Sequence, residues 1–235
     1  MIPTLAVLLL AHTLADFVLQ TAAMVAAKRQ PLTLAKHGAI VLITAAVATG
    51  SLSPTLLLLT AAHILIDAAK TFANRRGIRP FLVDQAAHAA TLIAFARWQP
   101  DLAAQGPWPA IAAPIMALTA GAILATRAGG FAVGLLMEPW TDATPKGLTN
   151  GGRAIGTLER GMIFLLILTG QAQSIGFLLA AKSVLRFGVV SDDRAASEYV
   201  IIGTLASVTW AIAAALATKL LLNSLPPLGI PDLLP

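Results

Sequence analysis

Residues 55–72 of the chain read TLLLLTAAHILIDAAKTF, an apolar segment long enough to cross a bilayer as one helix. His63 and Asp67 lie four positions apart within this segment. On an α-helix two such residues share a face and are separated by about 6 Å along the axis. The segment therefore predicts a membrane helix with an imidazole and a carboxylate on the same side.

The same pairing occurs twice more, in HTLAD at residues 12–16 and in DQAAH at residues 84–88. The first reads histidine then aspartate, as residues 63–67 do, whereas the second has the reverse order. An antiparallel helix needs this reversal to bring its histidine level with the other histidines. The three motifs therefore predict three adjacent helices with a common polar zone.

The composition indicates a polytopic membrane protein. Hydrophobic residues make up 57% of the 235 residues and charged residues only 11%, and the mean hydropathy is +0.79. Soluble domains usually carry about 25% charged residues. With no cysteine, the chain has neither disulfides nor thiolate metal ligands. The net charge of +5 indicates contact with lipid head groups, and no basic patch with aromatic platforms points to nucleic acid.

We predict an all-α membrane bundle of seven helices, or eight if residues 129–142 also enter the bilayer. Residues 128–157 are otherwise expected to form a loop with one short interfacial helix, because they include seven glycines. The region 158–187 is expected to form either one long helix, which gives the count of seven, or two helices separated by a turn at residues 169–171. The remaining predicted spans are residues 2–23, 34–49, 55–72, 81–98, 109–126 and 197–222. Residues 1–100 would form an N-terminal four-helix membrane domain, and residues 101–235 would hold the C-terminal helices.

Basic residues set the expected orientation, because cytoplasmic loops are enriched in lysine and arginine. The loops after the first and third predicted spans are basic, and the loop between the second and third has no charge. The first span has no basic segment before it, so we interpret it as a retained helix rather than a signal peptide. This places the N-terminus outside the cytoplasm. The basic residues concerned are Lys28, Arg29, Lys36, Arg75, Arg76 and Arg79.

In this topology three histidines form a layer about 6 Å from a layer of three aspartates. His37, at the start of the second span, could join the aspartate layer. A charge at the centre of a bilayer costs roughly 2.5–3.5 kcal/mol on insertion scales, and three adjacent carboxylates also repel one another. A divalent cation would resolve both problems. The predicted metal site comprises His12, Asp16, His63, Asp67, Asp84 and His88.

Imidazole and carboxylate groups suit zinc best, and manganese or iron would also accept them. The histidines would bind the metal, and the aspartates would act as further ligands, as groups that orient the ligands, or as the general base. A metal-free hydrogen-bonded or proton-relay network is the alternative. Lys70 is either an accessory group of the site, or a structural residue that reaches toward the surface or pairs with Asp67. Gln20 and Gln85 either line the same cavity or form hydrogen bonds between helices.

A second polar cluster lies in the C-terminal half. Arg153 and Arg160 are seven positions apart and Lys182 and Arg186 are four apart, so each pair shares a helix face. These four residues could bind an anionic head group. The alternative is anchoring at the cytoplasmic surface, with Glu159 and Glu198 held in ion pairs.

The motifs HTLADFVLQ (12–20), HILIDAAK (63–70) and FLVDQAAH (81–88) resemble the signature of DUF3307, a bacterial membrane-protein family with a domain of unknown function. The resemblance covers about the first hundred residues. Longer members carry segments similar to GRAIGTLER (152–160), KSVLRF (182–187) and EY (198–199). The resemblance implies a location in the bacterial inner membrane and no established activity.

The leading hypothesis is a metal-dependent membrane hydrolase, in which a metal-bound water attacks an ester, amide or phosphoester of a lipid-like substrate. Membrane lipids are then the expected partners. A transporter or channel for metal ions or protons would use the same polar layer as a transit site. A structural subunit of a membrane complex would use it to hold helices in register.

Overall fold

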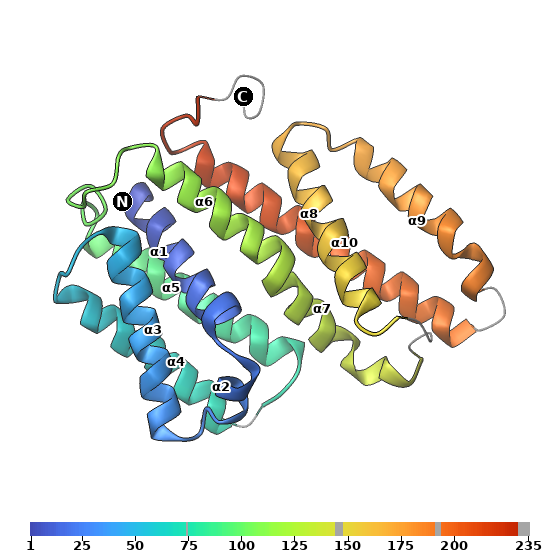
Figure 1. Cartoon of the computed structure of the whole chain (residues 1–235), viewed down its shortest axis with the longest axis horizontal. Helices are drawn as coiled ribbons and strands as arrows, with labels where there is room; N and C mark the ends of the chain where they lie inside the picture. The colour runs from blue at the N-terminus through green and yellow to red at the C-terminus, as the bar shows by residue number, and fades with distance from the viewer. Residues whose placement is uncertain (74, 144–147, 191–193, 230–235) are drawn as a thin grey trace. The chain divides into compact units, whose positions relative to one another are not determined.

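The computed structural model describes residues 1–73, 75–143, 148–190 and 194–229, and these residues contain helices and no strand. The chain divides into two compact units, Met1–Ile123 with Leu220–Leu228 and Leu124–Lys219 with Gly229–Pro235 (Figure 1). The first unit extends past the boundary expected near residue 100, because α6 (Ala112–Ile123) packs along α1 (Ile2–Leu14).

Four helices of the first unit form a closed ring. Both α1 and α4 contact α3 and α5, so each helix of the four has two neighbours in the ring (Figure 1). The three helices with paired histidine and aspartate are therefore adjacent, as the sequence predicts, and α3 completes the ring. The bounds of the first unit's elements are α1 Ile2–Leu14, the π-helical turn η1 Ala15–Leu19, α2 Ala22–Ala26, α3 Pro31–Thr49, α4 Thr55–Ala73, α5 Ile78–Trp98 and α6 Ala112–Ile123.

Local sequence signals account for the ends of these helices. Pro31 occupies the first helical position of α3, where its missing N–H costs nothing. Gly50 ends α3 with φ +62°, and its N–H bonds the carbonyl groups of the last turn. Gly77 precedes α5 with φ +103°. The helices α3 and α5 begin three residues earlier than the hydrophobic pattern alone predicts, because prolines and polar residues also fit the first turn.

The second unit corrects the loop predicted for residues 128–157. Helical structure continues from α6 through the π-helical turn η2 Leu124–Ala128, α7 Gly129–Met137 and the 3₁₀ turn η3 Glu138–Ala143. Gly129 serves close packing here rather than a turn. A Cβ at Gly129 would lie 2.6 Å from Trp210 Cδ1 and 2.9 Å from Arg160 Cδ. Only glycine lets these two large side chains approach the helix so closely.

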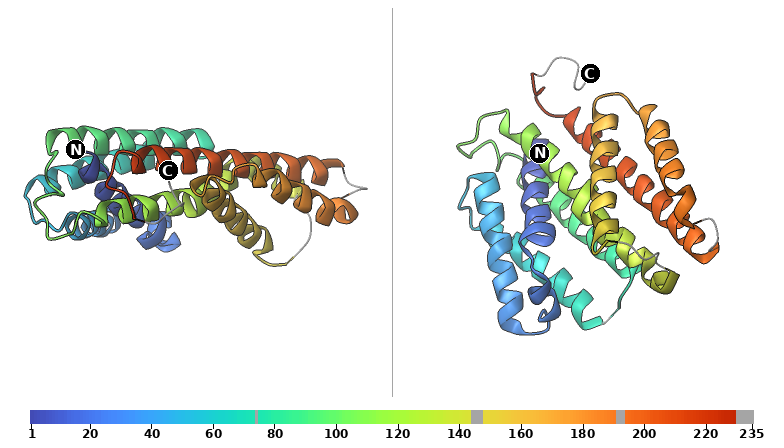
Figure 2. Two further views of the ribbon diagram at one scale, coloured as in Figure 1. Left: turned by 90° about the horizontal axis from the view of Figure 1, so that it is seen from above. Right: turned by 45° about the vertical axis from the view of Figure 1, so that its right-hand side comes forward.

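The alternative of two helices within residues 158–187 is confirmed. They are α8 (Gly151–Leu168) and α9 (Ser174–Val190), and Gly170 takes φ +73° in the turn between them. Figure 2 shows this pair, coloured yellow and orange, as neighbouring helices. The unit ends with α10 (Arg194–Leu222), whose last residues, from Leu220, belong to the first unit.

Five helical segments of the described residues are long and apolar enough to cross a membrane, so the predicted count of seven or eight is not confirmed. The ring helix α5 has 21 residues but falls outside this set. Its Asp84, Gln85 and His88 lower its hydropathy, and these are the residues that it contributes to the polar zone. The five segments are Ile2–Leu19, Pro31–Thr49, Thr55–Ala73, Ala112–Ala143 and Arg194–Leu222.

The contact between Gly106 and the end of α3 provides a test of this packing. A Cβ at Gly106 would collide with the buried carbonyl oxygen of Thr49, which is backbone and does not move aside. We expect Gly106→Ala to lower the free energy of unfolding by about 1–3 kcal/mol. Gly134→Ala is the matched control, because no heavy atom lies within 4 Å of its added Cβ. Thermal unfolding of the two purified variants in detergent compares them, and equal midpoints would contradict the packing.

Candidate metal centre

All four histidines of the chain meet inside the ring of α1, α3, α4 and α5. His12, His37, His63 and His88 are each 6% exposed or less. His63 occupies the middle of the group. Its ring centroid lies 4.2 Å from that of His88, 5.2 Å from that of His37 and 5.5 Å from that of His12. Residues from four separate helices therefore converge on one buried point.

Two imidazole nitrogens and two carboxylate oxygens lie at metal-ligand spacing. His37 Nε2 and His63 Nε2 are 3.2 Å apart. Asp16 Oδ1 lies 3.3 Å from the first nitrogen and 3.2 Å from the second. Asp67 Oδ2 lies 3.2 Å and 3.6 Å from them. Ligands about 2.0–2.1 Å from a tetrahedral zinc ion are themselves about 3.3–3.4 Å apart. The atoms of His37, His63 and Asp67 are therefore spaced as three ligands of such an ion, and Asp16 Oδ1 lies beside the two nitrogens.

Hydrogen bonding does not satisfy these oxygens. One proton shared between His37 and His63 would satisfy only the pair of nitrogens. Asp16 Oδ1 and Asp67 Oδ2 are buried, and neither has a hydrogen-bond partner among the described residues. A buried carboxylate oxygen without a partner carries the full cost of its lost hydration. A cation bound between the two nitrogens and the two oxygens would remove that cost.

His12 and His88 are held by hydrogen bonds that use only one nitrogen of each ring. His88 Nδ1 lies 2.9 Å from the carbonyl oxygen of Asp84, which can only accept, so this nitrogen carries the proton. His12 Nε2 similarly donates to Gln85 Oε1 at 3.3 Å, while Gln85 Nε2 donates to Asp84. His88 Nε2 and His12 Nδ1 are then buried lone pairs that have no hydrogen-bond partner in the part of the chain that the structure describes. Hydrogen bonds of this kind orient metal-binding histidines.

Two lysines form ion pairs with two of the carboxylates, Asp67 and Asp84. Lys70 Nζ lies 2.8 Å from Asp84 Oδ2, on the neighbouring helix, so the expected pairing of Lys70 with Asp67 is wrong. Asp67 Oδ1 instead binds Lys28 Nζ at 2.7 Å. The sequence indicated Lys28 only as a loop cation, because it follows α1 after the helix has ended at Gln20. No periodic pattern connects Lys28 to Asp67, and only the fold of the chain after α1 brings them together.

The predicted layers about 6 Å apart describe positions along the helices, whereas the ligand atoms themselves lie closer together. They are 3.2–3.6 Å apart around His37 and His63, and 3.8 Å apart in the pairs His12–Asp16 and His88–Asp84. His37 joins the aspartates as expected. Gln20 follows the π-helical turn that holds Asp16, and its buried Nε2 has no hydrogen-bond partner among the described residues.

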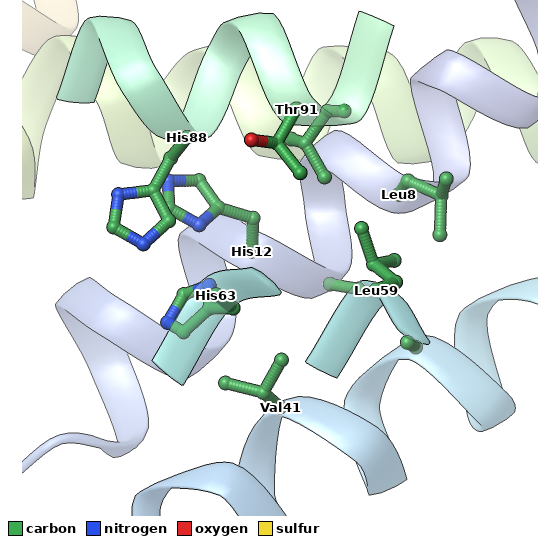
Figure 3. A pocket seen from close by; sticks show the side chains of 10 residues that line it. Leu8, His12, Val41, Leu59, His63, His88 and Thr91 are labelled. Atoms are coloured by element: carbon green, nitrogen blue, oxygen red, sulfur yellow. The ribbon is translucent and has the colours of Figure 1, made fainter. Parts of the chain in front are cut away.

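A small cavity adjoins the histidines. Its volume of about 20 Å³ is enough for one water molecule. Figure 3 shows His12, His63 and His88 grouped at one end of the cavity, with Leu8 and Leu59 at the other. The cavity therefore offers a polar wall of imidazoles in an otherwise apolar enclosure.

Among the basic residues of the second unit, Arg153 and Arg160 have different surroundings. Arg160 is only 3% exposed and bonds the backbone oxygen of Thr126 and the hydroxyl of Ser207, whereas Arg153 is exposed. Lys182 pairs with Glu159 at 2.6 Å. The expected ion pair of Glu198 is also present, with Arg194 at 2.9 Å. The side chain of Arg186 lies outside the described residues.

Comparison with known proteins gives one finding. Residues 4–106 match the family described as "Protein of unknown function (DUF3307)", so the chain resembles that family over the part that carries the histidine and aspartate motifs. The resemblance noted for the segments after residue 106 stays a prediction. Searches of curated proteins and of solved structures found no match.

Removing the Lys28 ammonium tests the electrostatics of the centre. Lys28→Met would leave Asp67, which is 2% exposed, with an uncompensated charge. Breaking such a pair typically costs about 3–5 kcal/mol, and the partial exposure of Lys28 favours the lower end. Lys28→Arg should retain most of the stability. Lys36→Met, at an exposed position, is the control. Denaturant unfolding of the metal-free protein in detergent measures all three, and similar losses for Lys28→Met and Lys36→Met would contradict the pairing.

Proposed function

We propose that this protein is a metal-dependent integral membrane hydrolase that cleaves an ester, amide or phosphoester bond of a lipid-like substrate. The observation that supports it best is the group of three buried ligand atoms of His37, His63 and Asp67, with a cavity large enough for water lined by His63. A site within apolar helices suits a substrate that is itself dissolved in the bilayer. Zinc is the ion that fits this donor set and spacing best.

In this proposal His37, His63 and Asp67 hold the ion. Two histidines and one carboxylate leave a fourth position open, which is the arrangement of catalytic rather than structural zinc sites. The ion would supply Lewis-acid activation of a water molecule. Lys28 fixes Asp67 through one carboxylate oxygen, so that the other faces the two histidines.

Asp16 is the proposed general base. Its Oδ1 lies within 3.3 Å of both ligand nitrogens and lacks a hydrogen-bond partner among the described residues, so it can accept a proton from water at the same point. The water oxygen bonds to the acyl carbon or to phosphorus, and the bond to the leaving oxygen or nitrogen breaks. The proton held by Asp16 passes to the leaving group. Lys70 is 35% exposed, so substrate would approach from the Asp84 side.

The proposed location is the bacterial inner membrane, with the N-terminus outside the cytoplasm. Five apolar helices are compatible with a membrane protein, and the asymmetric placement of basic residues supports the orientation. Surrounding lipids would then supply the substrate.

Transport of a metal ion or proton is the second candidate, and the end of α1 favours it. Asp16 lies in the π-helical turn Ala15–Leu19, after which Gln20 has an extended backbone. π-helical turns are frequent at functional sites, and interrupted helices bind ions in several transporter folds. The same carboxylate would then serve as a transit ligand.

Metal analysis tests the centre. We expect at least one equivalent of zinc in the purified full-length protein. His63→Ala should bind zinc at least about 100-fold more weakly, because it removes the central ligand. Thr91→Val is the matched control, because Thr91 lines the same cavity but bonds only within its own helix. Elemental analysis and zinc titration measure these effects. Wild-type protein that stays metal-free in zinc-containing buffer would refute the metal centre.

Asp16→Asn separates the two candidate functions. For a hydrolase, losing the base should lower turnover by about 10²–10⁴-fold, while His37, His63 and Asp67 still retain zinc. Turnover is measured with a panel of lipid esters, amides and phosphoesters, and zinc flux with protein reconstituted in vesicles. Zinc flux by the wild type, lost in Asp16→Asn and without hydrolysis of any substrate, would establish transport instead.

A further inference from the structure

A second group of metal-ligating residues lies beside the first. Asp67, Asp84 and His88 each offer a ligand atom, and the three atoms lie within 4.8 Å of one another. All three residues are at most 5% exposed. They come from two ring helices, α4 and α5, and the proposed hydrolytic mechanism uses only Asp67.

Two atoms of this group lack hydrogen-bond partners among the described residues. Asp84 Oδ2 accepts from Lys70 and Gln85, but Asp84 Oδ1 is buried without a partner. His88 Nδ1 is committed to a backbone carbonyl, which leaves His88 Nε2 as a buried lone pair. Such lone pairs are costly unless they bind a proton donor or a cation. A divalent ion bound by Asp84 Oδ1 and His88 Nε2 would use both.

Asp67 belongs to both groups. Its Oδ2 lies near the ligand nitrogens of His37 and His63, and the same residue stands within reach of Asp84 and His88. A carboxylate shared in this way is the usual bridge between two metal ions, which in phosphatases and nucleases lie about 3.5–4 Å apart. The arrangement therefore suits a pair of ions rather than two independent sites.

We propose that Asp67, Asp84 and His88 hold a second divalent ion, so that the centre is dinuclear and its substrate is a phosphate ester. The proposal rests on the proposed hydrolase and narrows its substrate class. Two ions would clamp both the attacking and the leaving oxygen of a phosphoryl group. The water oxygen bonds to phosphorus, the phosphorus–oxygen ester bond breaks, and the released proton goes to the leaving alkoxide.

The charge of the site supports a phosphate. Three carboxylates and the ammonium groups of Lys28 and Lys70 together leave one negative charge. Two divalent ions would turn this into three positive charges, which are costly in an apolar enclosure. One hydroxide and one phosphate dianion neutralise them. A single ion would need only one hydroxide, and a neutral carboxyl ester or amide would then fit equally well.

Manganese titration of the full-length protein in detergent tests the second ion. We expect two equivalents in the wild type, one in His88→Ala and less than one in Asp67→Asn, which removes the shared ligand. The ion that His88→Ala retains shows that this variant is folded. Thr91→Val, on the same helix as His88, should keep two. The electron paramagnetic resonance spectrum should show an exchange-coupled pair in the wild type and isolated ions in His88→Ala.

The outcomes separate the two proposals. One equivalent in both the wild type and His88→Ala would overturn the second ion and leave the mononuclear hydrolase intact. Two equivalents in both would overturn the assignment to His88. No bound ion in any protein would refute the metal centre itself. Inorganic phosphate is the probe for the substrate class, and it should bind the manganese-loaded wild type at least tenfold more tightly than His88→Ala. Equal affinities would overturn the phosphate assignment.

Discussion

The structure of the first unit depends on how three carboxylates are neutralised inside a ring of apolar helices. Asp16, Asp67 and Asp84 are each within 4 Å of at least one cationic or imidazole group. Lysines satisfy one oxygen of Asp67 and one of Asp84, and imidazoles surround Asp16. What the protein atoms leave unsatisfied lies at the centre, where two oxygens and two imidazole nitrogens face one another. The two unsatisfied carboxylate oxygens therefore still require a positive charge between them and the two nitrogens.

The polar zone was predictable because its spacing is a property of the helix. Residues four apart must share a face, so His63 and Asp67 point into the ring together, and the reversed order at residues 84–88 matches the neighbouring helix. His37 has no such partner on its own helix, and only its position at the start of a span indicated it. Nothing in the sequence indicated that Lys28 pairs with Asp67, because its position depends on a chain reversal after α1 rather than on periodicity.

Two other differences from the sequence reading have a physical cause. Glycine was taken as a sign of a loop in residues 128–157, yet Gly129 lies in a helix where a Cβ would strike Trp210. Five helices of the described residues pass a test of length and apolar composition, so the predicted count of membrane helices is not confirmed. The polar residues that α5 contributes to the site also make it the least apolar helix of the ring. The same residues therefore exclude it from the set of helices recognised by hydropathy.

The ion pair between Lys70 and Asp84 has a consequence for how the chain enters the membrane. These residues lie on consecutive helices, α4 and α5, and each would carry a full charge into hydrocarbon if its helix were inserted alone. Inserted together as a hairpin, the two helices bring a neutralised pair, and α5 no longer has to partition by its own hydropathy. In the proposed membrane location, insertion of α5 would therefore depend on α4, the helix that supplies Lys70.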